Sequence, residues 1–244
     1  MEPSMVIGLL TITSIPTITG VAEAISAQKK QNAASKEQEK FHLGGMLPRD
    51  DDDDEEEDDT TRGKWKEKAV CVLKDGKAWL NLPEAPVKGH RFCGFHFKYP
   101  GEEGHLGLVS TASDDSPMLN WIYVDAETGR LRHGTRKDTL GHVIGPWGWT
   151  EDEAFLTLRG ARGGFVARKE SVDDEDDGAE GGKQGEERWG VYWDPERKLL
   201  EAEGEREEDE EDDEDEEERV IPMLLRRRPL LGMASSYVRD EKKD

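Results

Sequence analysis

The chain has 244 residues, of which 34% are hydrophobic and 37% are charged, so only part of it can pack into a core. Its net charge of −22 is concentrated in Asp50–Asp59 (−10), Asp173–Glu187 (−7) and Glu205–Glu218 (−12), which leaves +7 for all other residues. Two cysteines exclude a disulfide framework, and no stretch reaches the ~18 apolar residues that a membrane-spanning helix needs. We therefore expect one modest, mildly basic domain with three acidic segments that repel themselves and stay disordered.

The N-terminal segment resembles an export signal only in part. Met5–Ile15 is apolar and Ala22–Ala24 has the spacing of a cleavage site, but Glu2 stands where basic residues are expected and Pro16 interrupts the run. We expect an intracellular protein, cytoplasmic or nuclear, with free thiols. Secretion with a single disulfide is the alternative.

Residues 1–49 are predicted to form a helical lead-in to the domain. Thr17–Lys40 is rich in Ala, Gln, Lys and Glu, which favour a helix. Its apolar side, from Val21 to Ile25, covers barely two turns, so the helix is either solvated or a short docking helix. Residues 50–62 follow as an acidic, disordered linker.

Residues 63–204 are predicted to form a β-rich domain, because short runs of strand-forming residues alternate with turn signals. Asp75-Gly76 marks one hairpin, and the acidic segment 173–187 is an expanded hairpin loop. The predicted strands are Ala69–Leu73, Lys77–Leu82, Arg91–Tyr99, Leu106–Thr111, Trp121–Val124, Arg130–His133, Ala154–Arg159, Gly164–Arg168, Trp189–Trp193 and Lys198–Ala202.

About nine or ten short strands with frequent turns are typical of an all-β antiparallel sandwich or barrel, here with one N-terminal helix. After the acidic disordered segment 205–218, residues 219–244 contain a final edge strand, Val220–Leu225, and a tail. Arg226–Arg228 faintly resembles a nuclear-import patch. In Arg91–Tyr99 the period of two assigns the side with Phe95 and Phe97 to the core.

The residue types that bind metals or catalyse reactions do not form a known motif. His90, Cys93 and His96 are three apart and alternate between the faces of a strand, so they cannot share one metal ion. No nucleophile elbow, phosphate-binding glycine loop or cofactor motif is present. No metal, cofactor or catalytic residue is predicted.

The stretch Gly145–Glu153 contains two tryptophans beside turn-forming residues. Trp147 and Trp149, with Trp121 and Tyr123, are the candidate contacts to a ligand or partner. The alternative is that these large rings fill the end of the β structure. Thr150 and Glu153 have the spacing of a helix capping box.

Three stretches resemble an uncharacterised family of small filamentous-fungal (ascomycete) proteins with the pattern WIYVD … GPWxWTxDE. They are Ser110–Ser113, Pro117–Asp125 and Gly145–Glu153, and Ile15–Gly20 is similar as well. The resemblance covers the N-terminal helix and residues 88–200. It implies no activity and transfers no catalytic or binding residue.

The leading hypothesis is a non-enzymatic, intracellular β-rich binding or scaffold protein that contacts an unidentified protein or small ligand, without direct nucleic-acid or membrane binding. One alternative is an acidic, chaperone-like binder of histones or other basic proteins through the acidic runs. Another is an enzyme or accessory protein of fungal metabolism with a small-molecule pocket. Binding through exposed charges weakens steeply with salt, whereas binding in a pocket does not.

Overall fold

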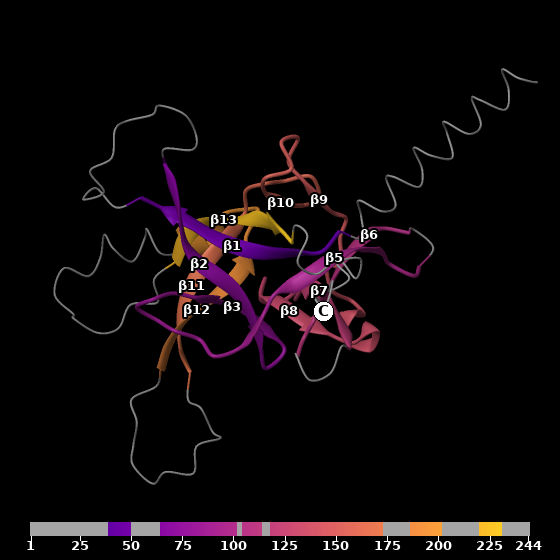
Figure 1. The fold of residues 1–244 in the computed structure, drawn as a ribbon, viewed down its shortest axis with the longest axis horizontal. Coiled ribbons are helices and arrows are strands. Elements are labelled where there is room, and N and C mark those ends of the chain that lie inside the picture. The colour runs from indigo at the N-terminus through magenta and orange to yellow at the C-terminus, as the bar shows by residue number, and fades with distance from the viewer. Residues whose placement is uncertain are drawn as a thin grey trace, which may run out of the picture. The chain divides into compact units, whose positions relative to one another are not determined.

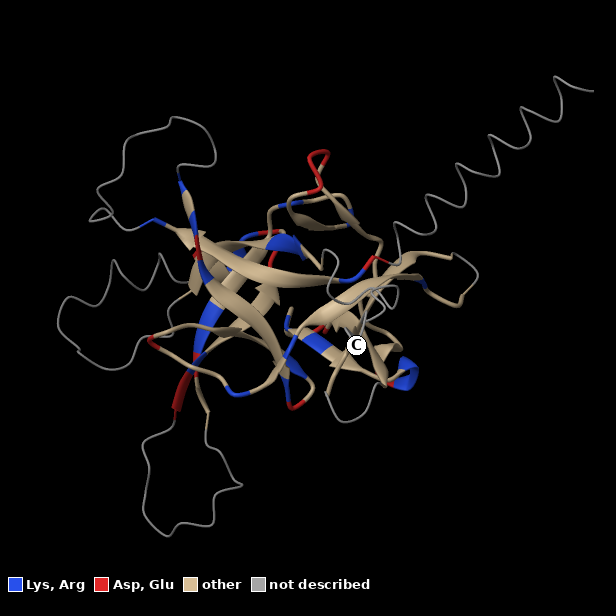
Figure 2. Cartoon of the chain, in the orientation of Figure 1, with Lys and Arg blue, Asp and Glu red and all other residues tan. Residues whose placement is uncertain are grey.

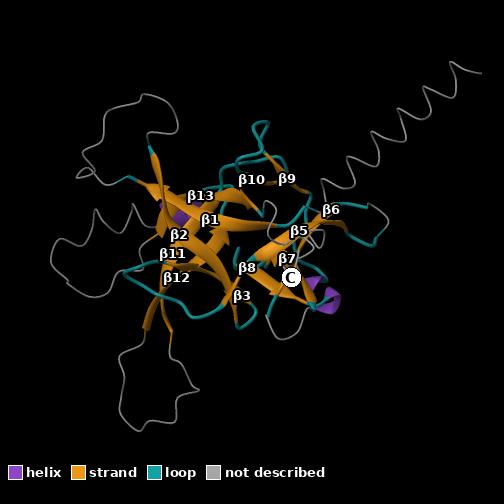
Figure 3. Cartoon of the chain, viewed as in Figure 1, coloured by secondary structure: helices purple, strands orange, loops and turns teal. Residues whose placement is uncertain are grey.

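The computed structural model describes residues 39–49, 64–101, 104–113, 118–172, 186–201 and 220–230, which all belong to one unit that begins at Glu39. Most of them lie in strands (Figures 1 and 3). The strands are β1 (Phe41–Pro48), β2 (Trp65–Lys74), β3 (Lys77–Asn81), β4 (His90–Arg91), β5 (Cys93–Lys98), β6 (Leu106–Thr111), β7 (Leu119–Val124), β8 (Leu131–Gly134), β9 (Trp147–Trp149), β10 (Leu156–Leu158), β11 (Phe165–Val172), β12 (Glu186–Trp193) and β13 (Val220–Pro229), with a 3₁₀ helix η1 (Arg136–Thr139). No helix among these residues is long and apolar enough to span a bilayer.

Six of the strands pair in a closed ring. The order is β1, β2, β3, β12, β11 and β13, which pairs again with β1, and every neighbouring pair is antiparallel. A sheet that closes on itself is a barrel and has no free edge within the ring. The predicted all-β antiparallel class is therefore confirmed, in its barrel form.

Strands β5 to β8 form an antiparallel meander beside the barrel (Figure 1). It joins the barrel sheet at two points, where Phe41 of β1 pairs with Gly94 of β5 and Lys77 of β3 pairs with Arg132 of β8. Strands β9 and β10 form a separate hairpin. The meander thus has one side toward the barrel and one side turned away from it.

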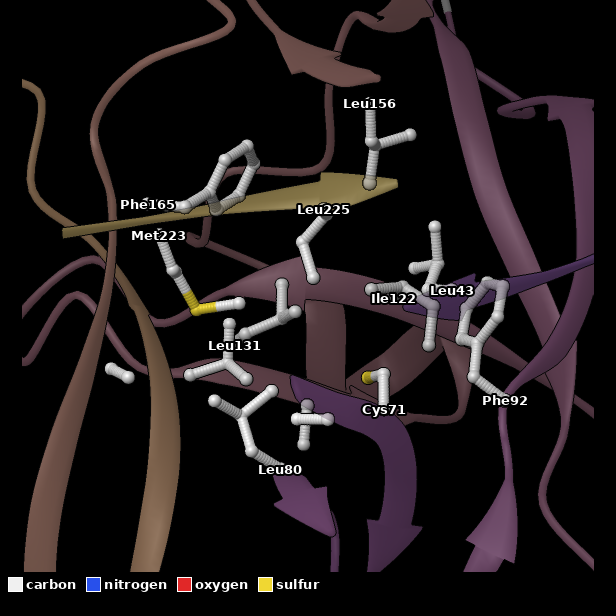
Figure 4. Packing of buried hydrophobic residues seen from close by; sticks show 14 of the residues in the cluster. Leu43, Cys71, Leu80, Phe92, Ile122, Leu131, Leu156, Phe165, Met223 and Leu225 are labelled. Carbon is white, nitrogen blue, oxygen red and sulfur yellow. The ribbon is translucent and has the colours of Figure 1, made fainter. Parts of the chain in front are cut away.

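The main core lies between the barrel strands, the inner side of the meander and β10. Its side chains are almost fully buried, and β1 and β2 contribute three each. Figure 4 shows Leu43, Cys71, Leu80, Phe92, Ile122, Leu131, Leu156, Phe165, Met223 and Leu225 packed together. Burial raises the pKa of the Cys71 thiol to about 12, so this cysteine is an inert core residue. Both Cys71 and Cys93 are free.

The strand count differs from the expectation of nine or ten, because thirteen strands are present in the described residues. Phe41–Pro48 belongs to the segment expected to be a helical lead-in, yet it forms β1, and its alternating Phe41 and Leu43 enter the core. The adjacent Gly44 and Gly45 leave room for Glu67 and Ala69, which contact the strand there. The rest of the predicted N-terminal helix lies outside the described residues.

The second difference concerns the faces of β5. Phe92, Gly94 and His96 are buried, whereas Phe97 is 44% exposed and Phe95 only half-buried. The assignment of Phe95 and Phe97 to the core was therefore wrong. A period of two separates the faces of a strand but does not say which one packs, and here the core takes the side that contains the glycine and the histidine.

Two further strand assignments change. Residues 198–201 are helical rather than extended, because the Asp194 carboxylate accepts hydrogen bonds from the backbone N–H groups of Lys198 (3.0 Å) and Leu199 (2.8 Å). The final strand is not at an edge, since β13 lies between β1 and β11 and completes the ring. The predicted hairpin at Asp75-Gly76 is confirmed, with φ of 51° and 73°.

The charge of the described residues is opposite in sign to that of the whole chain. They contain 24 Lys and Arg against 16 Asp and Glu, a net charge of +8, while the whole chain has −22. In Figure 2 the basic residues are spread over the strands. The acidic runs lie outside the described residues, apart from Glu186 and Glu187 at the start of β12.

The reversed faces of β5 can be tested by stability measurements. Phe92→Ala removes a ring that is 1% exposed and should lower the free energy of unfolding by about 3–5 kcal/mol. Phe97→Ala should lower it by under about 1 kcal/mol, because the ring is largely solvated. Urea denaturation of both variants measures the difference, and a larger loss in Phe97→Ala than in Phe92→Ala would show that Phe97 is on the core side.

Candidate functional site

The outer side of the meander is the most apolar exposed surface of the described residues. We define the aromatic face as Phe95, Phe97, Tyr99, Leu119 and Trp121. Phe95 pairs with Val109, which pairs with Trp121, so the three side chains lie on one side of β5, β6 and β7. The opposite side of the same strands enters the core through Leu108 and Ile122.

The rings of the aromatic face contact one another around Trp121. The Trp121 ring centroid lies 4.8 Å from that of Tyr99 and 6.1 Å from that of Phe97, both in edge-to-face geometry. Trp121 lies flat over Gly107, where an added Cβ would stand 2.6 Å from the indole Cζ3. Glycine at this position therefore allows the indole to rest on the strand.

Two members of this face are among the large hydrophobic side chains that remain exposed in the described residues. Phe97 is 44% exposed and Leu119 48%, and Met118, next to Leu119, is 64% exposed. Leu140 is 70% exposed and follows Thr139, whose hydroxyl bonds the Tyr99 hydroxyl at 2.7 Å. Apolar side chains grouped in this way are typical of an interaction surface.

Two hydroxyl groups at the aromatic face already have partners. The Tyr99 hydroxyl is bonded to Thr139, and the Thr111 hydroxyl is bonded to His90 Nε2 at 2.8 Å. Arg136 stacks 5.9 Å from the Tyr99 ring, and its Nη2 donates to the Pro100 carbonyl at 2.7 Å. The outward residues of β5, β6 and β7 include no charged side chain. The face offers apolar contact and few free hydrogen-bonding groups.

The four residues that the sequence singled out do not form one site. Trp121 belongs to the aromatic face. Tyr123 is buried and stacks on His142 with a centroid distance of 5.2 Å, and Trp147 is buried against Phe165. Trp149 is half-buried, and its ring centroid lies 4.6 Å from that of the core residue Phe41. Trp147 is thus part of the core, whereas Tyr123 is buried on the same side of β7 as Trp121.

Sequence reasoning missed Phe97, Tyr99 and Leu119 as surface residues. The alternation of Phe95, Phe97 and Tyr99 was recognised, but it was assigned to the core. Gly94, on the other side of the same strand, is a signal that could have located the face. It has no room for a Cβ beside Val109 and Phe92. A close approach of this kind marks the packed side of a strand.

The basic run Arg226–Arg228 is part of the barrel and is paired within it. Arg227 is buried, and its Nη2 and Nη1 donate to Glu39 (2.8 Å) and Glu153 (3.2 Å). Arg228 Nε donates to Glu67 at 2.7 Å. The guanidinium groups of Arg227 and Arg228 are therefore paired with carboxylates of the same domain. Glu153 lies in the β9–β10 turn rather than at a helix start, since its N–H bonds the Thr150 carbonyl.

The guanidinium of Arg227 stacks on the Trp149 ring at 4.9 Å, and His96 lies 5.0 Å from the same ring. Burial, together with the positive charge of Arg227, lowers the pKa of His96 to about 4. His96 is thus neutral in the folded chain at neutral pH. Among the described residues no group of three or more His, Cys, Asp or Glu is arranged to hold a metal ion.

The buried His96 predicts a loss of stability in mild acid. Its pKa is about 4 when folded and 6.5 in the unfolded chain, so the unfolded state binds the proton first as pH falls. The free energy of unfolding should fall by about 3 kcal/mol between pH 6.5 and pH 4 from this group. His42 and His133, whose pKa values are also lowered by burial, should add to the fall.

The measurement is urea denaturation at a series of pH values for the natural chain and for His96→Phe. The variant should lose the larger part of the pH dependence while it keeps the ring packing. An unchanged slope in His96→Phe would show that the ring titrates normally.

Comparison with known proteins gives one family. A family model described as "Fungal beta-trefoil domain" matches residues 20–230, which is most of the chain. No curated protein and no solved structure gives a match. The match agrees with a fungal family and with the antiparallel β fold.

Proposed function

The chain belongs to the fungal beta-trefoil domain family, and we propose that it is a non-enzymatic binding protein whose aromatic face binds an apolar segment of a protein partner. The observation that supports this most directly is that exposed Phe97 and Leu119 lie on the same side of the meander as Trp121, whose ring Phe97 contacts. Aromatic side chains in such clusters are the common anchors of protein interfaces.

The chemistry of the face favours a protein over a sugar or a polycation. A sugar ring needs several hydrogen-bond partners, whereas the Tyr99 and Thr111 hydroxyls are already bonded. A polycation needs carboxylates, and the outward residues of β5, β6 and β7 have none. An apolar protein segment needs neither, and its burial against this face is favourable in proportion to the area covered.

The polycation-binding alternative depends on the acidic runs rather than on the barrel. The described residues have a net charge of +8 and would repel a basic partner. Such a partner would have to bind Asp50–Asp59 or Glu205–Glu218, and raised salt would release it. We place the protein in the cytoplasm or nucleus, a proposal supported by the free Cys71 and Cys93.

The proposal is tested by affinity purification of the full chain from fungal cells, at low and at high salt. Phe97→Asp and Leu119→Asp put a charge on exposed positions and should weaken binding at least about tenfold with only a small fall in the melting temperature. Phe97→Leu keeps the face apolar and is the matched control. A partner held by the natural chain and by Phe97→Leu at both salt concentrations, and lost from both Asp variants, is the expected result.

Two results would contradict the proposal. A partner that stays on the Asp variants and is released by salt binds the acidic runs instead. Self-association of the natural chain in sedimentation velocity, abolished by Phe97→Asp, would identify the occupant of the face as a second copy of the chain.

A further inference from the structure

A second cluster lies on the outer side of the barrel, around Trp79 of β3. Trp79 belongs to a small hydrophobic cluster with Val72 and Val87, whereas its neighbours Ala78 and Leu80 enter the main core. Trp79 therefore points away from the barrel interior. We define the basic cluster as the cationic side chains that stack on or border the rings of Trp79 and Tyr192: Lys77, Arg130, Arg132, Arg168 and Arg188.

Arg130 is the centre of this cluster and is only 4% exposed. Its guanidinium lies 4.1 Å from the Trp79 ring centroid and 4.9 Å from that of Tyr192. One nitrogen, Nη1, donates to Glu170 and to the Tyr192 hydroxyl (3.0 Å). The stacking and these bonds fix the plane of the guanidinium.

The other edge of the Arg130 guanidinium has no acceptor. Nε and Nη2 are both buried and neither has a hydrogen-bond partner. A buried donor without a partner is costly, and in native proteins such a group calls for an explanation. The Nε–Nη2 edge presents two parallel N–H groups, the geometry that binds two oxygens of one anion.

The backbone of β12 is shaped to seat Arg130. Gly190 lies beneath the guanidinium, where an added Cβ would stand 2.6 Å from Arg130 Cζ. Any larger residue would push the guanidinium away from the strand. Gly190 and the rings of Trp79 and Tyr192 together hold the Nε–Nη2 edge of Arg130 in one orientation.

The surroundings of Arg130 have a surplus of positive charge. Arg132 Nη1 pairs with Asp125 at 3.3 Å, but Lys77 has no carboxylate partner within 4 Å among the described residues. Burial, and then the charges of Arg130 and Arg132, lower the pKa of Lys77. Burial lowers the pKa of Arg130 to about 10, with Arg132 and Arg168 adding to the shift. A bound anion would relieve this repulsion.

We propose that the basic cluster binds a phosphate group, with two oxygens on the Nε–Nη2 edge of Arg130 and with Lys77 and Arg132 balancing the remaining negative charge. A phosphate fits better than a carboxylate, because it has a second negative charge and further acceptor oxygens for these two side chains. Lys77 and Arg132 are partly exposed, so their side chains can move aside to admit the anion. The site uses none of the residues that define the aromatic face.

The test is isothermal titration of the full chain with inorganic phosphate and, separately, with methyl phosphate, against sodium chloride at equal ionic strength. Arg130→Lys keeps the charge but removes the two-donor edge, and it should weaken phosphate binding about tenfold or more. Lys77→Gln removes one partly exposed charge and should weaken it about threefold or more. Lys64→Gln, an exposed lysine at the opposite end of the β2–β3 hairpin, is the control and should bind as the natural chain does.

Tighter binding of methyl phosphate would assign the site to a phosphate ester, and tighter binding of inorganic phosphate would assign it to the free ion. If Arg130→Lys lowers the melting temperature without ligand, Lys77→Gln decides the result. The proposal is overturned if chloride produces the same heat as phosphate, or if Lys77→Gln binds phosphate no more weakly than Lys64→Gln.

Discussion

The antiparallel pairing of β1 with β13 is the interaction on which the rest of the structure depends. It extends from Phe41–Pro229 to Met46–Leu224 and joins the first and the last described strands. Without it, β1 and β13 would each have an unpaired edge, and the ring of six strands would be an open sheet. The same pairing sets Arg227 beside Glu39, so the ion pair between buried Arg227 and half-exposed Glu39 requires the closed ring.

The closed ring leaves two chemically different surfaces outside the core. The outward side chains of β5, β6 and β7 around Trp121 are uncharged, while the outer side of β3 and β12 is cationic around Trp79. Both depend on a glycine that lets a large flat group rest on a strand, Gly107 under the indole and Gly190 under the guanidinium. Each surface thus has a fixed geometry before any partner or ligand arrives, which lowers the entropy lost on binding.

The class of the fold could be predicted from the sequence, because turn signals and strand-forming runs are local. The pairing order could not, since β12 meets β3, and β13 meets β1, across long sequence separations. The side of β5 that packs was also beyond local reasoning: Phe97 is as hydrophobic as Phe92, and only the position of the barrel decides which of them is buried. Trp121 was predicted only as a candidate contact residue, and the basic cluster combines side chains from several strands and corresponds to no local sequence motif.

Residues 50–63 connect β1 to β2, and residues 173–185 connect β11 to β12, so both segments join strands that are already antiparallel neighbours. The register of each hairpin is fixed by the ladder beneath it, and each doubling of such a connection costs only about 0.6 kcal/mol. Insertions and deletions there change neither the pairing order nor the two outer surfaces. Lineages of this family are therefore free to diverge in the length of these connections while they inherit the same barrel.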